Sequence, residues 1–89
     1  MVTIDGVTDR IKIAVNELNM FIKKLAVVAY KEDAAISLIK KYNKFIQNRD
    51  ALKSLVINEN NYEFINKQLV VIEKEIKKTK KELNKDENL

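Results

Sequence analysis

The chain has 89 residues, a formal net charge of +4, a single glycine at Gly6, and no histidine, cysteine, proline or tryptophan. Without histidine or cysteine, catalysis would need paired carboxylates, a desolvated lysine or a metal held by oxygen ligands, and no grouping of acidic residues in the sequence favours such a site. We therefore predict a protein that is not an enzyme and that has no metal, no cofactor and no small-molecule substrate.

The composition predicts a folded protein with no membrane-spanning segment. Hydrophobic residues make up 46% and charged residues 34% of the chain, which is too apolar and too regular in spacing for a disordered segment. The longest purely apolar run covers residues 25–30, far fewer than the roughly 20 residues that cross a bilayer. No basic and apolar leader starts the chain, and the lack of cysteine fits a reducing compartment. We expect a cytoplasmic location.

The first predicted helix covers about residues 8–30. Apolar residues recur there every three or four positions, which is the spacing of one helix face. The stripe consists of Ile4, Val7, Ile11, Ala14, Leu18, Phe21, Leu25 and Val28. Thr8 is a candidate N-cap, because its hydroxyl can accept hydrogen bonds from the free amides of the first turn, and Asp9 suits the positive end of the helix dipole. Residues 3–6 are predicted to form a short arm before the helix.

The second predicted helix covers residues 33–57, with Asp33 as its cap. Its apolar stripe consists of Ala35, Ile36, Ile39, Tyr42, Phe45, Ile46, Leu52, Leu55 and Val56. Nothing between Tyr30 and Ala34 forces a break, so the alternative is one continuous rod over residues 8–57, about 75 Å long. We favour the break, because separate helices can cover one another's apolar stripes.

The third predicted helix covers residues 61–84, and the polar residues 85–89 form a tail. The asparagine-rich segment 58–61 is the clearest loop in the chain, and Asn60 with Glu63 has the spacing of a capping box. The helix has heptad-like apolar spacing at Ile65, Leu69, Ile72, Ile76, Thr79 and Leu83. The aromatic residues near the helix ends, including Tyr62 and Phe64, are predicted to pack where helices meet.

These elements predict an all-α fold in a single helical domain over residues 1–89. The arrangement expected is an antiparallel three-helix bundle or a helical hairpin with coiled-coil character, because loops of a few residues favour antiparallel neighbours. A core this small gains stability from idealised helix packing or from a second copy of the chain. A homodimer is therefore one of the expected states.

The apolar stripe of the third helix is the candidate protein interface. If the first two helices shield each other, this stripe, and above all its C-terminal half, is exposed to a partner helix. The predicted contact residues are Leu69, Ile72, Ile76 and Leu83. The alternative is that the same residues form the core of the bundle.

A cluster of lysines on the third helix is a candidate anion-binding surface. It consists of Lys74, Lys77, Lys78, Lys81 and Lys85. A lysine stripe can neutralise phosphates along a nucleic-acid backbone. However, Glu73 and Glu82 lie four residues from Lys77 and Lys78, which is the spacing of ion pairs within a helix. An ordinary solvated helix surface is the alternative interpretation.

The segment 32–45, with the sequence EDAAISLIKKYNKF, resembles the YlbF/YmcA family of small helical regulatory proteins. The resemblance continues through a polar loop and a helix with Ile72, Ile76 and Leu83, so that it covers residues 32–83. It implies an all-helical adaptor that works by contact with other proteins, including RNA-processing machinery. Members with an iron–sulfur cluster hold it through cysteines, which this chain lacks, so the resemblance implies no cluster here.

The function we predict is a small adaptor, regulator or inhibitor that acts by protein–protein contact through an apolar helix face. Two alternatives stay open. One is a nucleic-acid-binding helical module that uses the lysines of the third helix, and the other is a structural coiled-coil component, such as a phage or assembly scaffold.

Overall fold

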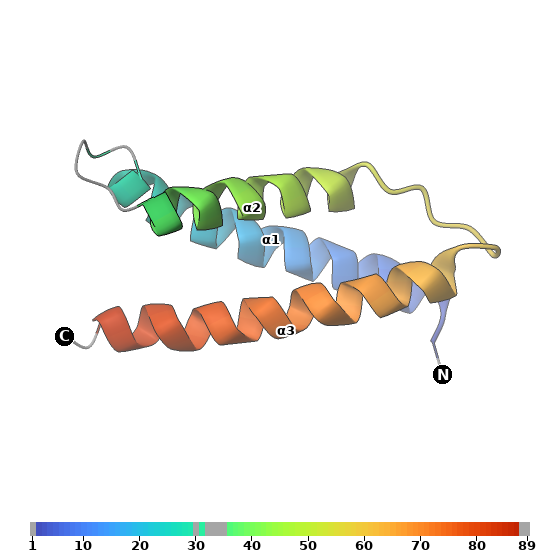
Figure 1. Cartoon of the computed structure of the whole chain (residues 1–89). Helices are drawn as coiled ribbons and strands as arrows, with labels where there is room; N and C mark the ends of the chain where they lie inside the picture. Colours follow the sequence, from blue (N-terminus) through green and yellow to red (C-terminus); the bar gives the residue numbers. More distant parts are fainter. Residues whose placement is uncertain (1, 30, 32–35, 88–89) are drawn as a thin grey trace. The chain divides into compact units, whose positions relative to one another are not determined.

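The computed structural model describes residues 2–29, 31 and 36–87, with the side chains of residues 28 and 83–87 outside that description. It contains three helices, which are α1 (Ile4–Ala29), α2 (Ile36–Lys53) and α3 (Tyr62–Glu87). Figure 1 shows them in sequence colours. No strand occurs in the described ranges. The predicted all-α class with three helices is confirmed.

The chain divides into two compact units, and α1 belongs to both. One unit consists of Met1–Ala14 and Ile57–Leu89, and the other of Val15–Val56. The first part of α1 therefore packs with α3, and the second part packs with α2. α1 can serve both because its apolar stripe continues from one part to the other, with Val7, Ile11, Leu18 and Leu25 all buried.

In the first unit, the start of α1 lies parallel to α3. Arg10 bonds to Asn66 and Glu73, while Val2 lies near Tyr62, so later residues of α1 meet later residues of α3. The buried residues of this unit come from both helices and are Val7, Ile11, Ala14, Ile65, Leu69, Ile76 and Thr79. Val7 and Leu69 are each only 1% exposed.

In the second unit, α1 and α2 run antiparallel. The rings of Phe21 and Phe45 lie with their centroids 5.6 Å apart, and the Arg49 guanidinium donates a hydrogen bond of 3.1 Å to Oδ1 of Asn19. In a continuous rod, Phe21 and Phe45 would lie about 36 Å apart at about 1.5 Å per residue. The rod is therefore excluded, and the chain reverses between the two helices. The predicted Asp33 cap lies outside the described residues.

The predicted start of the first helix is wrong, because Thr3 caps α1 and Thr8 does not. Oγ1 of Thr3 accepts a hydrogen bond of 2.9 Å from the amide of Gly6, whereas the Thr8 hydroxyl donates to the carbonyl of Ile4. Both threonines can cap a helix. With Thr3 as the cap, Ile4 and Val7 lie within the helix and belong to its apolar stripe. A Cβ at Gly6 would lie 2.9 Å from Oγ1 of Thr3, so the glycine permits a close cap.

The second helix is shorter than predicted and its stripe is placed differently. α2 ends at Lys53, where the amide and hydroxyl of Ser54 both donate to the carbonyl of Asp50. Its buried residues are Phe45 and Leu52, one heptad apart. Ile36 is 73% exposed, because nine residues before Phe45 is half a turn around the helix. Val56 lies beyond the helix and is 78% exposed, so both were wrongly placed in the predicted stripe.

α3 begins at Tyr62, one residue after the predicted start, and its cap is Asn58. Oδ1 of Asn58 accepts hydrogen bonds from the amides of Asn60 and Asn61, at 2.9 and 3.1 Å. In return, Oδ1 of Asn61 accepts a bond of 2.8 Å from the amide of Asn58. This reciprocal pair is a capping box that lies two residues before the predicted one. The side chain of Asn61 takes the role that glutamate or glutamine usually has. α3 then continues to Glu87, so the predicted tail from residue 85 is partly helical.

Candidate interaction surface on α3

The predicted apolar interface on α3 is a buried face of the folded chain. Leu69 is 1% exposed and Ile76 is 6% exposed, and Ile65 and Thr79 on the same stripe are also buried. Ile72 is half-buried, and the side chain of Leu83 lies outside the described residues. The prediction that Leu69 and Ile76 are exposed to a partner is wrong, because the fold itself covers this stripe.

The opposite face of α3 carries a second regular stripe, which we call the outer stripe. It consists of Phe64, Lys67, Val71, Lys74, Lys78 and Lys81. These residues follow one another at steps of three and four, so they share one helix face, and all are exposed. Phe64 is 63% exposed and Val71 is 59% exposed, so two large apolar side chains a heptad apart face solvent on this stripe.

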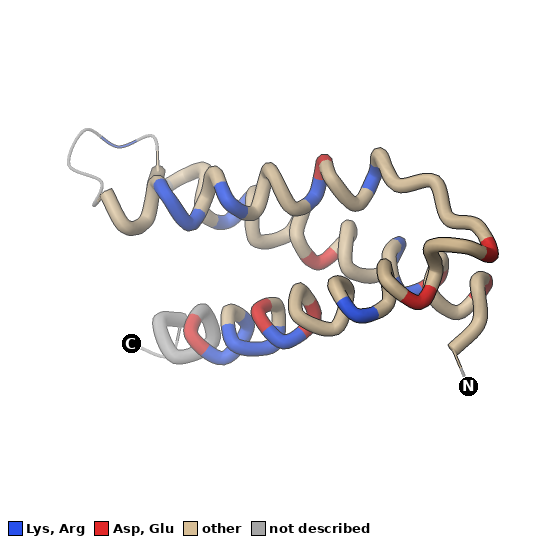
Figure 2. The backbone as a smooth tube through the Cα atoms, turned by 45° about the vertical axis from the view of Figure 1, so that its right-hand side comes forward, with Lys and Arg blue, Asp and Glu red and all other residues tan. Residues whose placement is uncertain are grey.

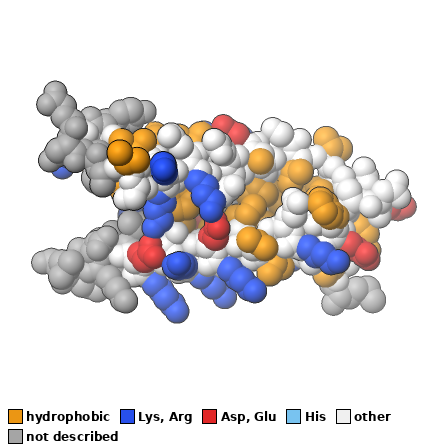
Figure 3. All heavy atoms as spheres, in the orientation of Figure 1, with side chains coloured by type: hydrophobic (Ala, Val, Ile, Leu, Met, Phe, Trp, Pro, Cys, Tyr) orange, Lys and Arg blue, Asp and Glu red, His pale blue; other side chains and the backbone are white. Residues whose placement is uncertain are grey.

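The lysines predicted to bind anions are exposed along the second half of α3. Lys74, Lys77, Lys78 and Lys81 all lie on the surface, with Lys77 just beside the outer stripe. Figure 2 shows blue segments of the backbone alternating with red ones along this part of the helix, and Figure 3 shows basic side chains standing out from it. The side chain of Lys85 lies outside the described residues.

Glu73 pairs with Arg10 of α1 rather than with Lys77, so the predicted pairing within the helix is wrong. Nη2 of Arg10 lies 2.5 Å from Oε1 of Glu73, and Nε lies 3.1 Å from Oε2, so the contact is bidentate. Nη1 of the same guanidinium donates to Oδ1 of Asn66. A planar guanidinium matches both carboxylate oxygens at once, which the single ammonium of a lysine cannot do.

This contact raises the pKa of Arg10 above its ordinary value, chiefly through the hydrogen bond to Glu73. Because the pKa of Arg10 is higher in the folded chain, its charge stabilises the fold fully at every pH below the ordinary pKa. This stabilisation is lost only when the pH rises through the raised pKa. The charge of Arg10 therefore makes no pH-dependent contribution to the free energy of unfolding at any pH below the ordinary pKa of arginine. Both side chains are about one-third exposed, so water screens the pair and we expect it to contribute about 1 kcal/mol at most.

The side chains of the lysines in the outer stripe face solvent. Among the residues that the structure describes, no ion pair involves Lys74, Lys77 or Lys78. The predicted pair of Lys78 with Glu82 is therefore not formed there. Both arginines of the chain, by contrast, are engaged within it, since Arg49 contacts Asp50 and Asn19. The positive surface of α3 thus consists of lysine ammonium groups.

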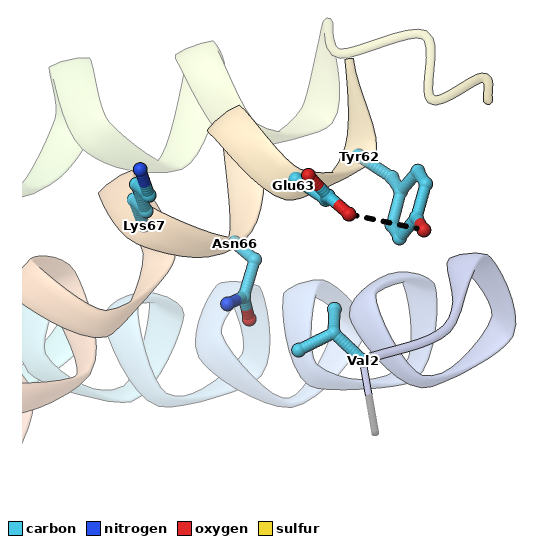
Figure 4. A pocket seen from close by; sticks show the side chains of 5 residues that line it. All are labelled: Val2, Tyr62, Glu63, Asn66 and Lys67. Carbon is cyan, nitrogen blue, oxygen red and sulfur yellow. Dashed lines mark hydrogen bonds between the residues drawn. The ribbon is translucent and has the colours of Figure 1, made fainter. Parts of the chain in front are cut away.

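A shallow depression lies where the chain enters α1 and α3, beside the start of the outer stripe. Figure 4 shows Val2 and Asn66 pointing into the space between the two helix starts, while Lys67 extends away from it. The Tyr62 hydroxyl donates a long hydrogen bond of 3.4 Å to Oε1 of Glu63. No group of three acidic side chains suited to a metal ion occurs among the described residues. The depression supplies a contact surface of mixed polarity.

Sequence reasoning missed Phe64, Lys67 and Val71 as candidate site residues, although their spacing was visible. The sequence predicts that Phe64 packs where helices meet, and it predicts an anion-binding surface from the lysines alone. The missed signal is a run of steps of three and four on the face of α3 that lies opposite the core stripe.

Comparison of the chain with known protein families, with curated proteins and with solved structures gives no match. The resemblance to YlbF/YmcA proteins therefore stays a prediction. No helix in the described part of the chain combines the length and the apolarity that crossing a bilayer requires.

Proposed function

We propose that the protein is a non-enzymatic helical binding module, acting in the cytoplasm, that contacts a partner protein through the outer stripe of α3. The observation that carries this proposal is the alternation of exposed apolar and lysine side chains on one helix face, with Phe64 and Val71 among Lys67, Lys74 and Lys78. No cofactor or small-molecule substrate takes part. The contact surface differs from the one that the sequence suggested, but the class of function is the same.

The chemistry of the outer stripe favours a partner segment that is both acidic and apolar. Phe64 can bury a large area with few rotatable bonds, which makes aromatic side chains frequent anchors of protein interfaces. The surrounding lysines steer an acidic partner and fix its position, and they add more to association rate and specificity than to affinity. The resemblance to YlbF/YmcA proteins would place this partner among proteins of the RNA-processing machinery.

Nucleic acid fits the outer stripe less well than a protein does. Arginine makes the bidentate phosphate and base contacts typical of nucleic-acid interfaces, and both arginines of this chain are engaged within the fold. Two exposed apolar side chains within the stripe would meet a hydrophilic backbone. A partner protein covers them with apolar atoms of its own.

The proposal can be tested by photo-crosslinking in the source cells. We expect a photoreactive phenylalanine at position 64 to capture one defined protein, and the same residue at the exposed position 36 of α2 not to capture it. Charge reversal by Lys74→Glu with Lys78→Glu should reduce the capture by about tenfold or more, because like charges replace complementary ones. The matched control is Lys40→Glu with Lys53→Glu, which makes the same change in net charge on exposed positions of α2.

Three results would contradict the proposal. Equal capture from positions 64 and 36 would show that the outer stripe is not a specific surface. Equal loss with the two pairs of lysine variants would show that only net charge matters. A captured product that nuclease removes would assign the stripe to a nucleic acid.

A further inference from the structure

The solvent face of α1 carries a line of exposed apolar residues that the fold does not use. Ile13, Met20 and Val27 are 60%, 55% and 70% exposed and follow one another at heptad spacing. Because α1 is one uninterrupted α-helix of 26 residues, these side chains lie along one face over about 21 Å. The opposite face of α1 already forms the core through residues such as Val7, Leu18 and Leu25. The exposed line is therefore additional to the stripe that holds the chain together.

Charge is distributed unevenly along this same face of α1. Asp5, Asp9 and Lys12 are exposed in the first half of the helix, where the acidic groups outnumber the lysine, and Lys23 and Lys24 are exposed in the second half. The face is thus acidic toward one end and basic toward the other. Such a helix face is complementary to itself when it meets a second copy that runs in the opposite direction.

We infer that the partner of this face is a second copy of the chain, docked with the two α1 helices antiparallel. In this arrangement Ile13 packs against Met20 of the second copy. Asp9 is four positions before Ile13, and Lys24 is four positions after Met20, so Asp9 lies against Lys24 of the second copy. Lys23 is next to Lys24 and within reach of the same carboxylate. The two-fold symmetry of a dimer repeats each contact, as an isologous interface requires.

The antiparallel direction follows from charge. In a parallel pair, Asp9 would lie beside Asp9 of the second copy, and the lysines beside lysines, so every charged contact would be repulsive. In the antiparallel pair, Val27 of one copy lies against Gly6 of the other, because Gly6 is seven positions before Ile13 and Val27 is seven positions after Met20. Gly6 has no side chain and so leaves room for Val27. One helix face of this length buries less than the roughly 800 Å² per partner of a standard interface, so we expect a Kd in the micromolar range or weaker.

The inference is independent of the outer stripe of α3 and can be tested by sedimentation equilibrium at about 10 µM to 1 mM protein. We expect the wild-type chain to dimerise reversibly. Asp9→Lys, and separately Lys23→Glu with Lys24→Glu, should each raise the Kd by about tenfold or more, because like charges then face each other twice. Combining the three substitutions should restore the wild-type Kd to within about threefold. Within one helix, positions 9 and 24 are about 22 Å apart, so this rescue requires a second chain.

The lysine variant separates a specific pairing from a general charge effect. It lowers the net positive charge of the protein, which would strengthen non-specific association, whereas the antiparallel pair predicts weaker association. Met20→Asp should abolish the dimer, and Ile36→Asp, at a similarly exposed apolar position of α2, should leave it unchanged. Helicity by circular dichroism checks that each variant is folded. A monomeric wild type over the whole range, or failure of the combined charge reversal to restore dimerisation in a folded variant, overturns the inference.

Discussion

Replacing Phe45 by alanine is expected to lower the free energy of unfolding by about 3–5 kcal/mol. Phe45 is 3% exposed, and its ring packs against that of Phe21 with the centroids 5.6 Å apart and the planes tilted by 43°. The substitution removes a large apolar side chain and leaves a cavity between α1 and α2. A chain of this size has a total stability of only about 4–13 kcal/mol. Urea denaturation followed by circular dichroism measures the loss.

Phe64→Ala is the matched control for this prediction. The same side chain is removed, but Phe64 is 63% exposed, so the free energy of unfolding should change by about 0.5 kcal/mol or less. If both substitutions lowered the stability equally, Phe45 would not hold the second unit together as the structure indicates.

The second large effect is expected for Ile76→Lys, which should destabilise the chain by about 4 kcal/mol or more. Ile76 is 6% exposed, so the ammonium group would lose its hydration without gaining a partner, and the apolar side chain would be lost as well. If the interface inferred from the sequence were correct, the same variant would stay fully helical and lose only partner binding. The two expectations are therefore opposite, and a thermal unfolding curve distinguishes them.

Val71→Lys provides the comparison on the same helix. Val71 is 59% exposed on the outer stripe, so a lysine there keeps its hydration and should change the free energy of unfolding by about 0.5 kcal/mol or less. An unfolding midpoint for Ile76→Lys equal to that of Val71→Lys would show that the stripe of Ile76 is not part of the core.

The fold class and the core of α1 could be predicted because the apolar spacing is regular and nothing interrupts it. The periodicity predicts Val7, Leu18 and Leu25 on one apolar stripe, and all three are buried. α2 was harder, since apolar residues occur on more than one of its faces, and only packing against α1 selects the face of Phe45. The caps were misplaced because Thr3 and Thr8, or Asn58 and Asn60, offer equivalent local chemistry.

The sequence shows both stripes of α3 but does not tell which of them faces solvent, for a different physical reason. An apolar stripe on a helix looks the same whether it faces the core or a partner, so the spacing of the Leu69 stripe is compatible with both. Similarly, Glu73 has a lysine four residues away, but its actual partner, Arg10, lies 63 positions away in the sequence. Long-range contacts such as this one decide which charges of α3 stay exposed.

The two faces of α3 differ in exposure: Leu69 is 1% exposed and lies in the core, whereas Val71 is 59% exposed on the outer stripe, which we propose to bind a partner. Because the chain has no cysteine, a single introduced thiol reports on one position at a time, and the rate of thiol modification in the native protein measures its exposure. We expect Val71→Cys to react within about threefold of the unfolded chain, and Leu69→Cys to react at least about 100-fold more slowly, because reaction there requires opening of the structure. Equal, fast reaction at both positions in a folded protein would contradict the assignment of Leu69 to the core and Val71 to the exposed face.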